Sequence, residues 1–321
     1  MILTVIEHDR GVIEAASLQA LTLGRDLAEQ TGSALEAALI GNDAASLEET
    51  IRAFGMTVIH HVTHPQLDDY APAAWAEAAI QLGRARGAQA ILAPGSDRGN
   101  EVLAHVAAKT GLAMAANCAQ VEAGDVYRVV RLRWGSSVLE EAELSGEIKL
   151  LSVAPHTVEA TEAPSDDVAV EQFEPTLAEA DLRVKVTRRD ETASSGVTLK
   201  TARLVVGGGR GVGSAEGFAV LEELAEVLGG IVGGSRVATN NGWRPHTNQV
   251  GLTGTRIAPQ LYIACGISGA IQHLVGCKGA KHILVINTDR DAPFFSRADY
   301  GVVGDLHEVV PALVAELKKR G

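Results

Sequence analysis

The stretch ARLVVGGGRGVGS, residues 202–214, sets the expected fold of the second half of the chain. Its first residues, 202–206, form an apolar run that predicts a strand, and a glycine-rich turn follows them. Helical periodicity then extends over residues 215–228. A strand, a glycine loop and a helix in this order are typical of an open α/β sheet. Ligands bind such sheets outside the carboxyl ends of the strands, so the sequence predicts a ligand site there.

The residues downstream repeat this alternation. We expect strands over residues 260–264, 282–286 and 300–303, a short helix over residues 268–275 and a terminal helix over residues 306–319. Short glycine-rich or polar loops separate these elements. The second half is therefore expected to be a doubly wound parallel sheet of the Rossmann type, whose loops converge on one extended ligand.

The first half predicts a second sheet. Residues 1–111 alternate between apolar runs and helical patterns, with one helix expected over residues 12–30, which indicates parallel βαβ units. The next four apolar runs are short and separated by glycines, so we expect them to form an antiparallel extension. Residues 157–174 are expected to be loop, and residues 182–187 an edge strand.

The length of 321 residues and one polar stretch together predict two domains. Residues 188–200, RRDETASSGVTLK, are polar and have no apolar period. We place the boundary there, with an N-terminal α/β domain over residues 1–190 and a C-terminal domain over residues 191–321.

The composition excludes several classes of protein. A formal net charge of −12 argues against nucleic-acid binding, which needs a basic face. The three cysteines are scattered, so neither a disulfide framework nor a zinc site is expected. The apolar runs are too short for membrane insertion. The sequence begins directly with an apolar run and has no leader pattern, so we expect a cytoplasmic protein.

The glycine loop at residues 207–214 has two interpretations. It follows a strand and opens a helix, so its backbone N–H groups are candidates to face an anion. It fails the GxGxxG pattern because Ser214 stands at the last position, and it could equally be a βα loop without a ligand. Arg210 favours the first interpretation, since a guanidinium within a glycine turn pairs with an anion or an acidic side chain.

Two further loops allow the same pair of interpretations. Ser235 and Arg236 follow an apolar pair and two glycines, and Arg236 is either a ligand contact or an ordinary surface charge. Residues 249–254, QVGLTG, are either a tight ordinary turn or a loop that approaches a ligand closely through its glycines.

The remaining polar positions lie on later elements. Ser268 is expected to cap the short helix, whose small residues would let a diphosphate approach its N-terminus. His273 on that helix is either structural or a hydrogen-bond donor to a ligand. Asn287 and Asp305 follow later strands and could bind a ribose or adenine, or serve as caps. Hydrolytic motifs such as a Ser–His–Asp order or HExxH are absent from the sequence.

Taken in order, these segments resemble the alpha subunit of electron transfer flavoprotein. The resemblance rests on residues 207–213, 234–236, 249–254, 265–273 (CGISGAIQH), 286–293 and 298–306, and in the N-terminal domain on the strand order and residues 90–97. It implies one FAD in the C-terminal domain. It also implies an N-terminal domain that has an adenine-nucleotide-hydrolase-like fold and faces the partner subunit.

The resemblance further implies a role and partners. A beta subunit would complete a heterodimer and would hold AMP. The heterodimer would take electrons from acyl-CoA and related dehydrogenases, as in fatty acid beta-oxidation, and deliver them to a membrane-bound quinone oxidoreductase. The chain would then be an electron carrier without substrate turnover of its own, and not an enzyme.

By the same resemblance, the residues that bind FAD are Arg210, Ser235, Arg236, Gln249, Val250, Gly251, Leu252, Thr253, Ser268, Gly269, Ala270, Ile271, Gln272, His273, Asn287 and Asp305. Thr253 would face the flavin N5, His273 its pyrimidine side and Arg236 the ring. The chain departs from the family at Leu252, where many relatives have Gln, and at Thr255, which replaces a common Lys. The departure at Leu252 puts one flavin or ribityl hydrogen bond in question.

Three other functions remain open at this point. Within the same family, the chain could belong to an electron-bifurcating flavoprotein that uses NADH and holds a second FAD in its beta subunit. An NAD-dependent deacylase or transhydrogenase-like domain is a candidate from a different class, because related sheets bind NAD. A non-redox regulator that kept the fold is the last.

Overall fold

The computed structural model describes residues 1–67, 69–134, 136, 138–165, 167–188 and 197–320. The contacts within the chain divide it into two compact units, Met1–Arg189 and Asp190–Gly321. The stretch predicted to link two domains, residues 188–200, lies largely outside the described residues.

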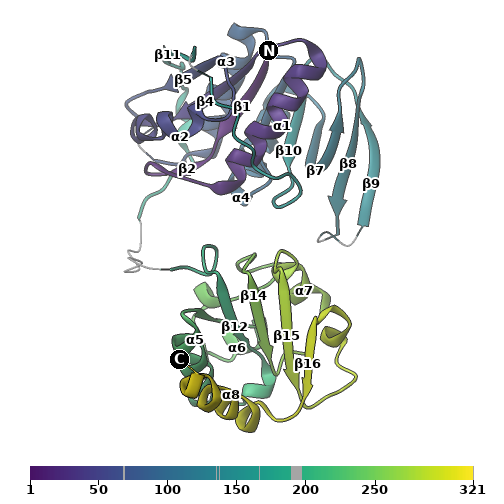
Figure 1. The fold of residues 1–321 in the computed structure, drawn as a ribbon. Coiled ribbons are helices and arrows are strands. Elements are labelled where there is room, and N and C mark those ends of the chain that lie inside the picture. The colour runs from purple at the N-terminus through teal and green to yellow at the C-terminus, as the bar shows by residue number, and fades with distance from the viewer. Residues whose placement is uncertain (68, 135, 137, 166, 189–196, 321) are drawn as a thin grey trace. The chain divides into compact units, whose positions relative to one another are not determined.

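The first unit is built on a nine-stranded sheet in the order β11-β5-β4-β1-β6-β10-β7-β8-β9 (Figure 1). Its pairs are parallel except β7 with β8 and β8 with β9, which are antiparallel. The strands are β1 Ile2–Ile6, β4 Leu35–Ile40, β5 Val58–Val62, β6 Ala90–Pro94, β7 Met114–Glu122, β8 Tyr127–Arg133, β9 Val138–Leu144, β10 Lys149–Val153 and β11 Ala169–Phe173.

Helices cover both faces of this sheet and bury its apolar strands. One core joins the sheet to α1 and α2, and the other joins it to α3 and α4. Helices α1, α3 and α4 end at glycines, and α3 begins at a proline and α4 after a serine cap, as their local sequence predicts. The helices are α1 Ala15–Thr31, η1 Asn42–Leu47, α2 Glu48–Arg52, α3 Pro72–Arg86, α4 Asp97–Thr110 and η2 Glu179–Leu182.

Four expectations for the first unit were wrong. The helix expected from residue 12 begins at Ala15, because Val12–Ile13 (β3) pairs with His8–Asp9 (β2) in a hairpin. The last strand of the expected antiparallel extension, β10, is parallel and lies between β6 and β7. The expected loop at residues 157–174 contains β11, and within the described residues 182–187 form no strand.

Burial explains the errors over β10 and β11. The apolar residues of β10 are buried on both faces of the sheet, as in other central parallel strands. By contrast, β11 is exposed along most of its length, so it carries no apolar signal although its backbone pairs with β5. An edge strand of this kind is held by backbone hydrogen bonds and leaves little trace in the sequence.

The second unit is a five-stranded, wholly parallel sheet in the order β13-β12-β14-β15-β16 (Figure 1). It confirms the predicted α/β class with parallel sheets. Its elements are β12 Leu204–Gly208, η3 Arg210–Val212, η4 Glu216–Phe218, α5 Ala219–Leu228, β13 Ile231–Gly234, α6 Arg236–Asn240, η5 His246–Asn248, β14 Leu261–Cys265, α7 Ile271–Cys277, β15 His282–Asn287, η6 Pro293–Arg297, β16 Tyr300–Val303 and α8 Leu306–Arg320.

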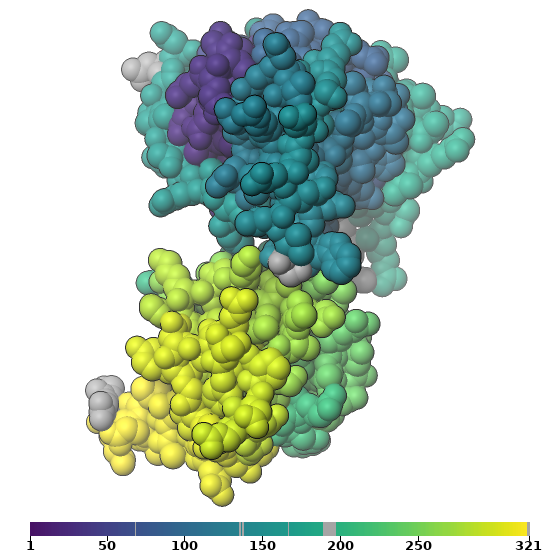
Figure 2. All heavy atoms as spheres, turned by 90° about the vertical axis from the view of Figure 1, so that its right-hand side faces the viewer, coloured from purple at the N-terminus to yellow at the C-terminus, as the bar shows by residue number. Residues whose placement is uncertain are grey.

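Two clusters of buried apolar side chains lie on the two faces of the second sheet. Helices α5, α6 and α8 pack on one face, and α7 with η6 packs on the other. Strand β13, which the sequence pattern did not predict, lies at one edge, and β16 lies at the other with all its residues exposed. In Figure 2, the yellow spheres of the last residues cover part of the viewed surface of this unit, beside the yellow-green and green spheres of its earlier residues. Among the described residues, no helix combines the length and apolarity that crossing a membrane requires.

Candidate functional site

The carboxyl ends of the strands in the second unit enclose a pocket of about 440 Å³. This size lies within the range of about 300–1,000 Å³ that is usual for ligand sites. Predicted site residues that line it are Arg210, Ser235, Arg236, Ser268, Ala270, Gln272, His273 and Asn287. Residues that the sequence reasoning missed are Gly211, Val237, Gly266, Ile267 and Asp289. The predicted residues that do not line it are Gln249, Val250, Gly251, Leu252, Thr253, Gly269, Ile271 and Asp305.

The glycine loop after β12 packs closely against the end of β14 and the loop that follows it. The N–H of Gly209 donates to the carbonyl of Cys265 at 2.9 Å, and that of Gly211 donates to Gly266 at 3.0 Å. The N–H of Gly213 donates within the turn to Arg210. A Cβ at Gly211 would lie 2.7 Å from the Cα of Gly266, so the two loops are in direct backbone contact. These three N–H groups therefore have partners within the chain, and a contact of this loop with an anion through Arg210 stays a prediction.

Two arginines on neighbouring loops line the pocket. Arg210 follows β12, and Arg236 begins α6 after β13. Neither forms an ion pair with a described residue. Ser235 caps α6, since its Oγ accepts from the N–H of Ala238 at 3.4 Å. The pocket therefore has two guanidinium groups available for an anionic ligand.

The loop over residues 249–254 lies behind the pocket wall. The amide of Gln249, which is buried, accepts from the Thr239 hydroxyl at 2.8 Å and donates to the Thr253 hydroxyl at 3.0 Å. The N–H of Leu252 donates to the carbonyl of Gln272 at 2.7 Å, and the Leu252 side chain is 38% exposed. Within the unit, this loop supports α7, and a contact of Thr253 with a flavin N5 stays a prediction.

The loop from Gly266 to α7 forms one wall of the pocket. Gly266 has φ +61° and could not take a side chain, because its Cβ would lie 2.7 Å from Gly211. Ser268 does not cap α7 as expected, since Ala270 stands at the cap position without a side-chain hydrogen bond. Instead, the Ser268 carbonyl accepts from the N–H of Phe294 at 3.2 Å. The Ser268 side chain is thus placed among the residues that line the pocket.

His273 is the one buried titratable side chain that lines the pocket among the described residues. Its Nε2 lies 2.8 Å from the hydroxyl of Tyr262 in β14, and its Nδ1 is buried without a hydrogen-bond partner in the described chain. Burial lowers the pKa of His273 to about 4, and an interaction with the Val250 backbone opposes this shift. The imidazole is therefore neutral near pH 7.

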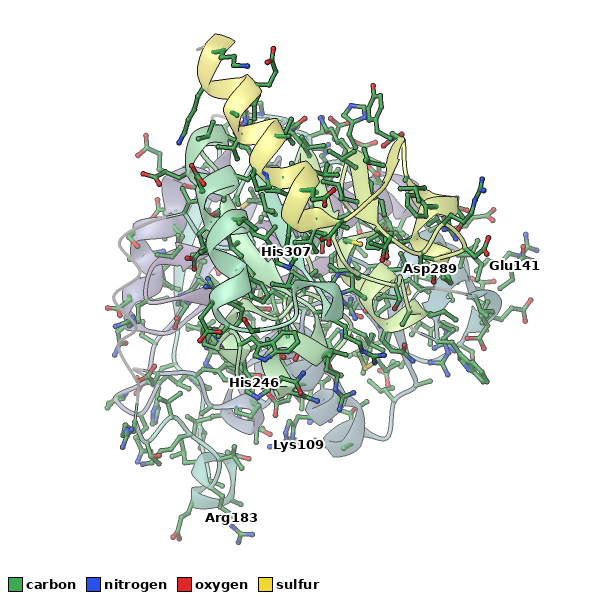
Figure 3. The ribbon with its side chains drawn as sticks, turned by 90° about the horizontal axis from the view of Figure 1, so that it is seen from below. Lys109, Glu141, Arg183, His246, Asp289 and His307 are labelled. Atoms are coloured by element: carbon green, nitrogen blue, oxygen red, sulfur yellow. The ribbon has the colours of Figure 1, made fainter. Side chains whose placement is uncertain are left out.

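The loops after β15 and β16 carry different roles. The Nδ2 of Asn287 donates to the carbonyl of Ile267 at 3.0 Å, so Asn287 joins two pocket loops. Asp289, two residues after Asn287, also lines the pocket. Its position just after a predicted strand could have identified it from the sequence. Asp305 caps α8, where its carboxylate accepts from the N–H of His307 at 2.9 Å. Figure 3 labels Asp289 and His307, which lie at this end of the second unit.

The arrangement suits a ligand with both anionic and hydrogen-bonding parts. Two guanidinium groups can pair with phosphate oxygens, and hydroxyl and amide groups can donate to carbonyl oxygens. Apolar side chains of Val237 and Ile267 supply contact area for a ring. Within the described residues, no group of His, Cys, Asp and Glu side chains could hold a metal ion.

Comparison with protein families matches both units. The electron transfer flavoprotein domain matches residues 2–178, and the electron transfer flavoprotein FAD-binding domain matches residues 198–278. The second match includes most of the pocket loops. Its range ends before Asn287 and Asp289.

Relatives of similar length share about a third of their residues with this chain. An electron transfer flavoprotein subunit alpha of Thermoanaerobacterium thermosaccharolyticum is 34% identical over 317 residues, covering 98% of this chain and 96% of the relative. One of Mycobacterium tuberculosis is 36% identical over 321 residues, covering 99% and 98%. Protein FixB of Clostridium saccharobutylicum is 34% identical, covering 98% and 95%.

Solved structures add no argument about the fold. The thiamine diphosphate-dependent 4-hydroxybenzoylformate decarboxylase of Rhodococcus jostii RHA1 aligns with 96% of this chain and 54% of its own, at 14% identity and a TM-score of 0.26. The domain matches and the full-length relatives agree with each other. The chain belongs to the electron transfer flavoprotein alpha-subunit family.

Proposed function

We propose that the pocket of the second unit holds the isoalloxazine ring of FAD. With a beta subunit, the chain would carry electrons from acyl-CoA and related dehydrogenases to a membrane-bound quinone oxidoreductase, with no substrate turnover of its own. The observation that carries this proposal is the convergence of residues from four loops, including Arg236, Ser268 and His273, on one pocket of about 440 Å³. The match of residues 198–278 to a FAD-binding domain supports it.

The residues present fit a flavin in three respects. The buried Nδ1 of His273, without a partner in the described chain, can bond to a polar atom of the ligand. The backbones of Gly211 and Gly266 approach each other closely, and no side chain projects into the pocket from these two positions. Arg210 and Arg236 offer positive charge without competing ion pairs in the described chain.

Each of these groups has a task during electron transfer. Bound FAD supplies the redox chemistry, because its ring system accepts and releases electrons. Arg236 would stabilise negative charge that develops on the ring, and Arg210 would pair with a phosphate or another anionic part. His273, held neutral by burial, would orient the ring through a hydrogen bond without adding a charge.

The first unit offers a surface for the beta subunit. Trp134, Val138 and Leu139 at the β8–β9 end of its sheet are 85%, 48% and 66% exposed. Exposed apolar groups of this kind mark interaction sites. We propose that this unit faces the beta subunit, that the beta subunit holds AMP, and that the heterodimer works in the bacterial cytoplasm, since the relatives named above are bacterial.

Co-purification with the beta subunit and a count of flavin and AMP per heterodimer test the proposal. We expect a yellow complex with one FAD. Arg236→Ala should weaken flavin binding about tenfold, which is the loss of one charge-assisted hydrogen bond. Arg203→Ala is the matched control, because Arg203 is exposed at the opposite end of β12 and should leave the flavin content unchanged.

The same measurement separates the other candidates. Two FAD per heterodimer would indicate the electron-bifurcating type, which should then be reduced by NADH. NAD binding to a complex without flavin would indicate an NAD-dependent activity. Normal flavin content without reduction by any acyl-CoA dehydrogenase would indicate a non-redox regulator. A colourless heterodimer that FAD cannot reconstitute would contradict the proposal.

A further inference from the structure

Among the described residues, Tyr262 is the side chain that hydrogen-bonds to the His273 ring, and the fold reserves space for it. Its ring is fully buried in β14, and its hydroxyl lies 2.8 Å from His273 Nε2. The two rings are nearly parallel, with centroids 6.0 Å apart and an angle of 29°. Phe294 packs edge-on against His273 at 5.9 Å. A Cβ at Gly207 would overlap the Tyr262 hydroxyl, so this position on β12 must be glycine.

Hydrogen-bond accounting fixes which atom of this pair is the donor. A neutral imidazole has one N–H and one lone pair, and a phenol has one proton to donate. Were the hydrogen of His273 on Nε2, the Tyr262 hydroxyl would accept it and its own proton would be buried without an acceptor in the described chain. That arrangement costs roughly 1–3 kcal/mol. Donation from Tyr262 to Nε2 places the hydrogen of His273 on Nδ1, where the Val250 backbone or an acceptor atom of a ligand in the pocket can receive it, so that neither donor of the pair is left unpaired.

Both side chains keep the protonation states that this bond needs. Burial raises the pKa of Tyr262 well above its ordinary value, so the phenol stays protonated. Burial also lowers the pKa of His273, so the imidazole stays neutral near pH 7. The pair is therefore a fixed donor and acceptor.

We propose that Tyr262 is a positioning residue that holds His273 in its Nδ1–H tautomer, so that Nδ1 donates a hydrogen bond to an acceptor atom of the ligand in the pocket. The identity of that acceptor as a flavin atom rests on the proposed function. Tyr262 itself does not line the pocket, and it would act only through His273. The ligand thereby gains an uncharged hydrogen-bond donor, the Nδ1–H of His273, whose direction is set by Tyr262 in β14.

Imidazole nitrogen shifts, measured by NMR on the heterodimer with only this chain ¹⁵N-labelled at histidine, test the proposal. The signal of His273 is assigned by its loss in His273→Gln. We expect a protonated Nδ1 and an unprotonated Nε2 in the flavin-free and flavin-loaded protein, with a shift of the Nδ1–H proton on flavin binding. A hydrogen on Nε2 would overturn the proposal. An Nδ1–H signal unchanged by bound flavin would also overturn it, since the hydrogen would then serve the Val250 backbone alone.

Tyr262→Phe adds a second readout that a merely structural role would not move. We expect the His273 hydrogen to distribute over both nitrogens, the flavin potential to change, and flavin affinity to fall about fivefold to tenfold. Tyr300→Phe, which removes an exposed hydroxyl in the same unit, is the matched control and should change none of these. If Tyr262→Phe does not fold, the tautomer in the unmodified protein still decides the proposal.

The failure of this inference is distinguishable from that of the proposed function. A heterodimer that binds no flavin would contradict the proposed function, while the tautomer is still read in the flavin-free protein. A heterodimer that binds flavin with the His273 hydrogen on Nε2 would contradict this inference alone.

Discussion

The two units have parallel sheets of the same kind but treat the carboxyl ends of their strands differently. In the first unit, side chains of the chain fill this edge. Ser96 caps α4 and also donates to the carboxylate of Glu7, which follows β1. The hollow that remains beside His8 and Trp75 has about 20 Å³, room for no more than a water or two.

In the second unit, the corresponding edge stays open. Glycines at the ends of β12 and β13 and in the loop after β14 carry no side chains that could fill it, and a pocket of about 440 Å³ results. The comparison shows that a parallel sheet provides only the place for a site, at the carboxyl ends of its strands. The residues that follow each strand decide whether that edge is closed or open, which is why function has to be argued from the site.

The largest expected effect comes from closing the open edge. Gly266→Ala would place a Cβ 2.7 Å from Gly211 at a residue with φ +61°, so it should cost about 3–5 kcal/mol of unfolding free energy and reduce flavin content. Gly213→Ala is the matched control. Gly213 has φ +85° but open space around it, so only the backbone cost of about 1 kcal/mol should appear in urea unfolding. Equal losses for the two variants would contradict the packing argument.

Acid should weaken the second unit through His273. Its folded pKa of about 4 lies below the unfolded value of 6.5, so the unfolded chain binds more protons between these values and stability falls as pH drops through this window. The loss reaches at most roughly 3 kcal/mol. Urea unfolding of the flavin-free protein at several pH values should show a shallower acid dependence for His273→Gln. Parallel curves for both proteins would argue against a buried neutral imidazole.

Acid should also weaken the first unit, through the carboxylate of Glu36 and its partners His60 and Arg86. Burial by itself raises the pKa of Glu36, but hydrogen bonds from His60 and Arg86 outweigh it and hold that pKa below its ordinary value. This stability is present above the unfolded pKa of 4.5 and is lost as pH falls through the folded pKa.

Glu36→Gln should therefore cost about 2 kcal/mol at pH 7, less than a fully buried pair because Arg86 is a third exposed. Flavin content should stay normal, since the cluster lies in the unit without the pocket. Denaturant unfolding and flavin absorbance measure the two effects. If flavin content fell together with the unfolding free energy, the pocket of the second unit would depend on the first unit.

The smallest effect is expected at Asp305. Its carboxylate caps α8, so Asp305→Ala should cost about 1 kcal/mol. Because Asp305 does not line the pocket, the flavin stoichiometry of the heterodimer should be unchanged. Loss of FAD with an unchanged unfolding midpoint would instead favour a direct contact with the cofactor, as the family resemblance implies.

Some roles of the predicted site residues follow from the local sequence, and others depend on contacts with residues far away in the chain. Arg210, Arg236 and His273 were predicted and line the pocket, because Arg210 and Arg236 follow directly after strands and His273 lies in the helix after the next strand. The sequence could not decide between the two interpretations of residues 207–214, because the N–H groups of Gly209 and Gly211 bond to Cys265 and Gly266, more than fifty residues away in the sequence. No local pattern records such a contact.

By itself, the sequence determined the α/β class, the alternation of strands and helices, and the family. These follow from apolar period and from short motifs that keep their order, which are local properties of the chain. The tertiary structure alone decided that β10 lies between β6 and β7, that β11 forms an edge, and that Tyr262 meets His273. Strand order and buried hydrogen bonds join residues distant in sequence, so packing selects them and local pattern does not.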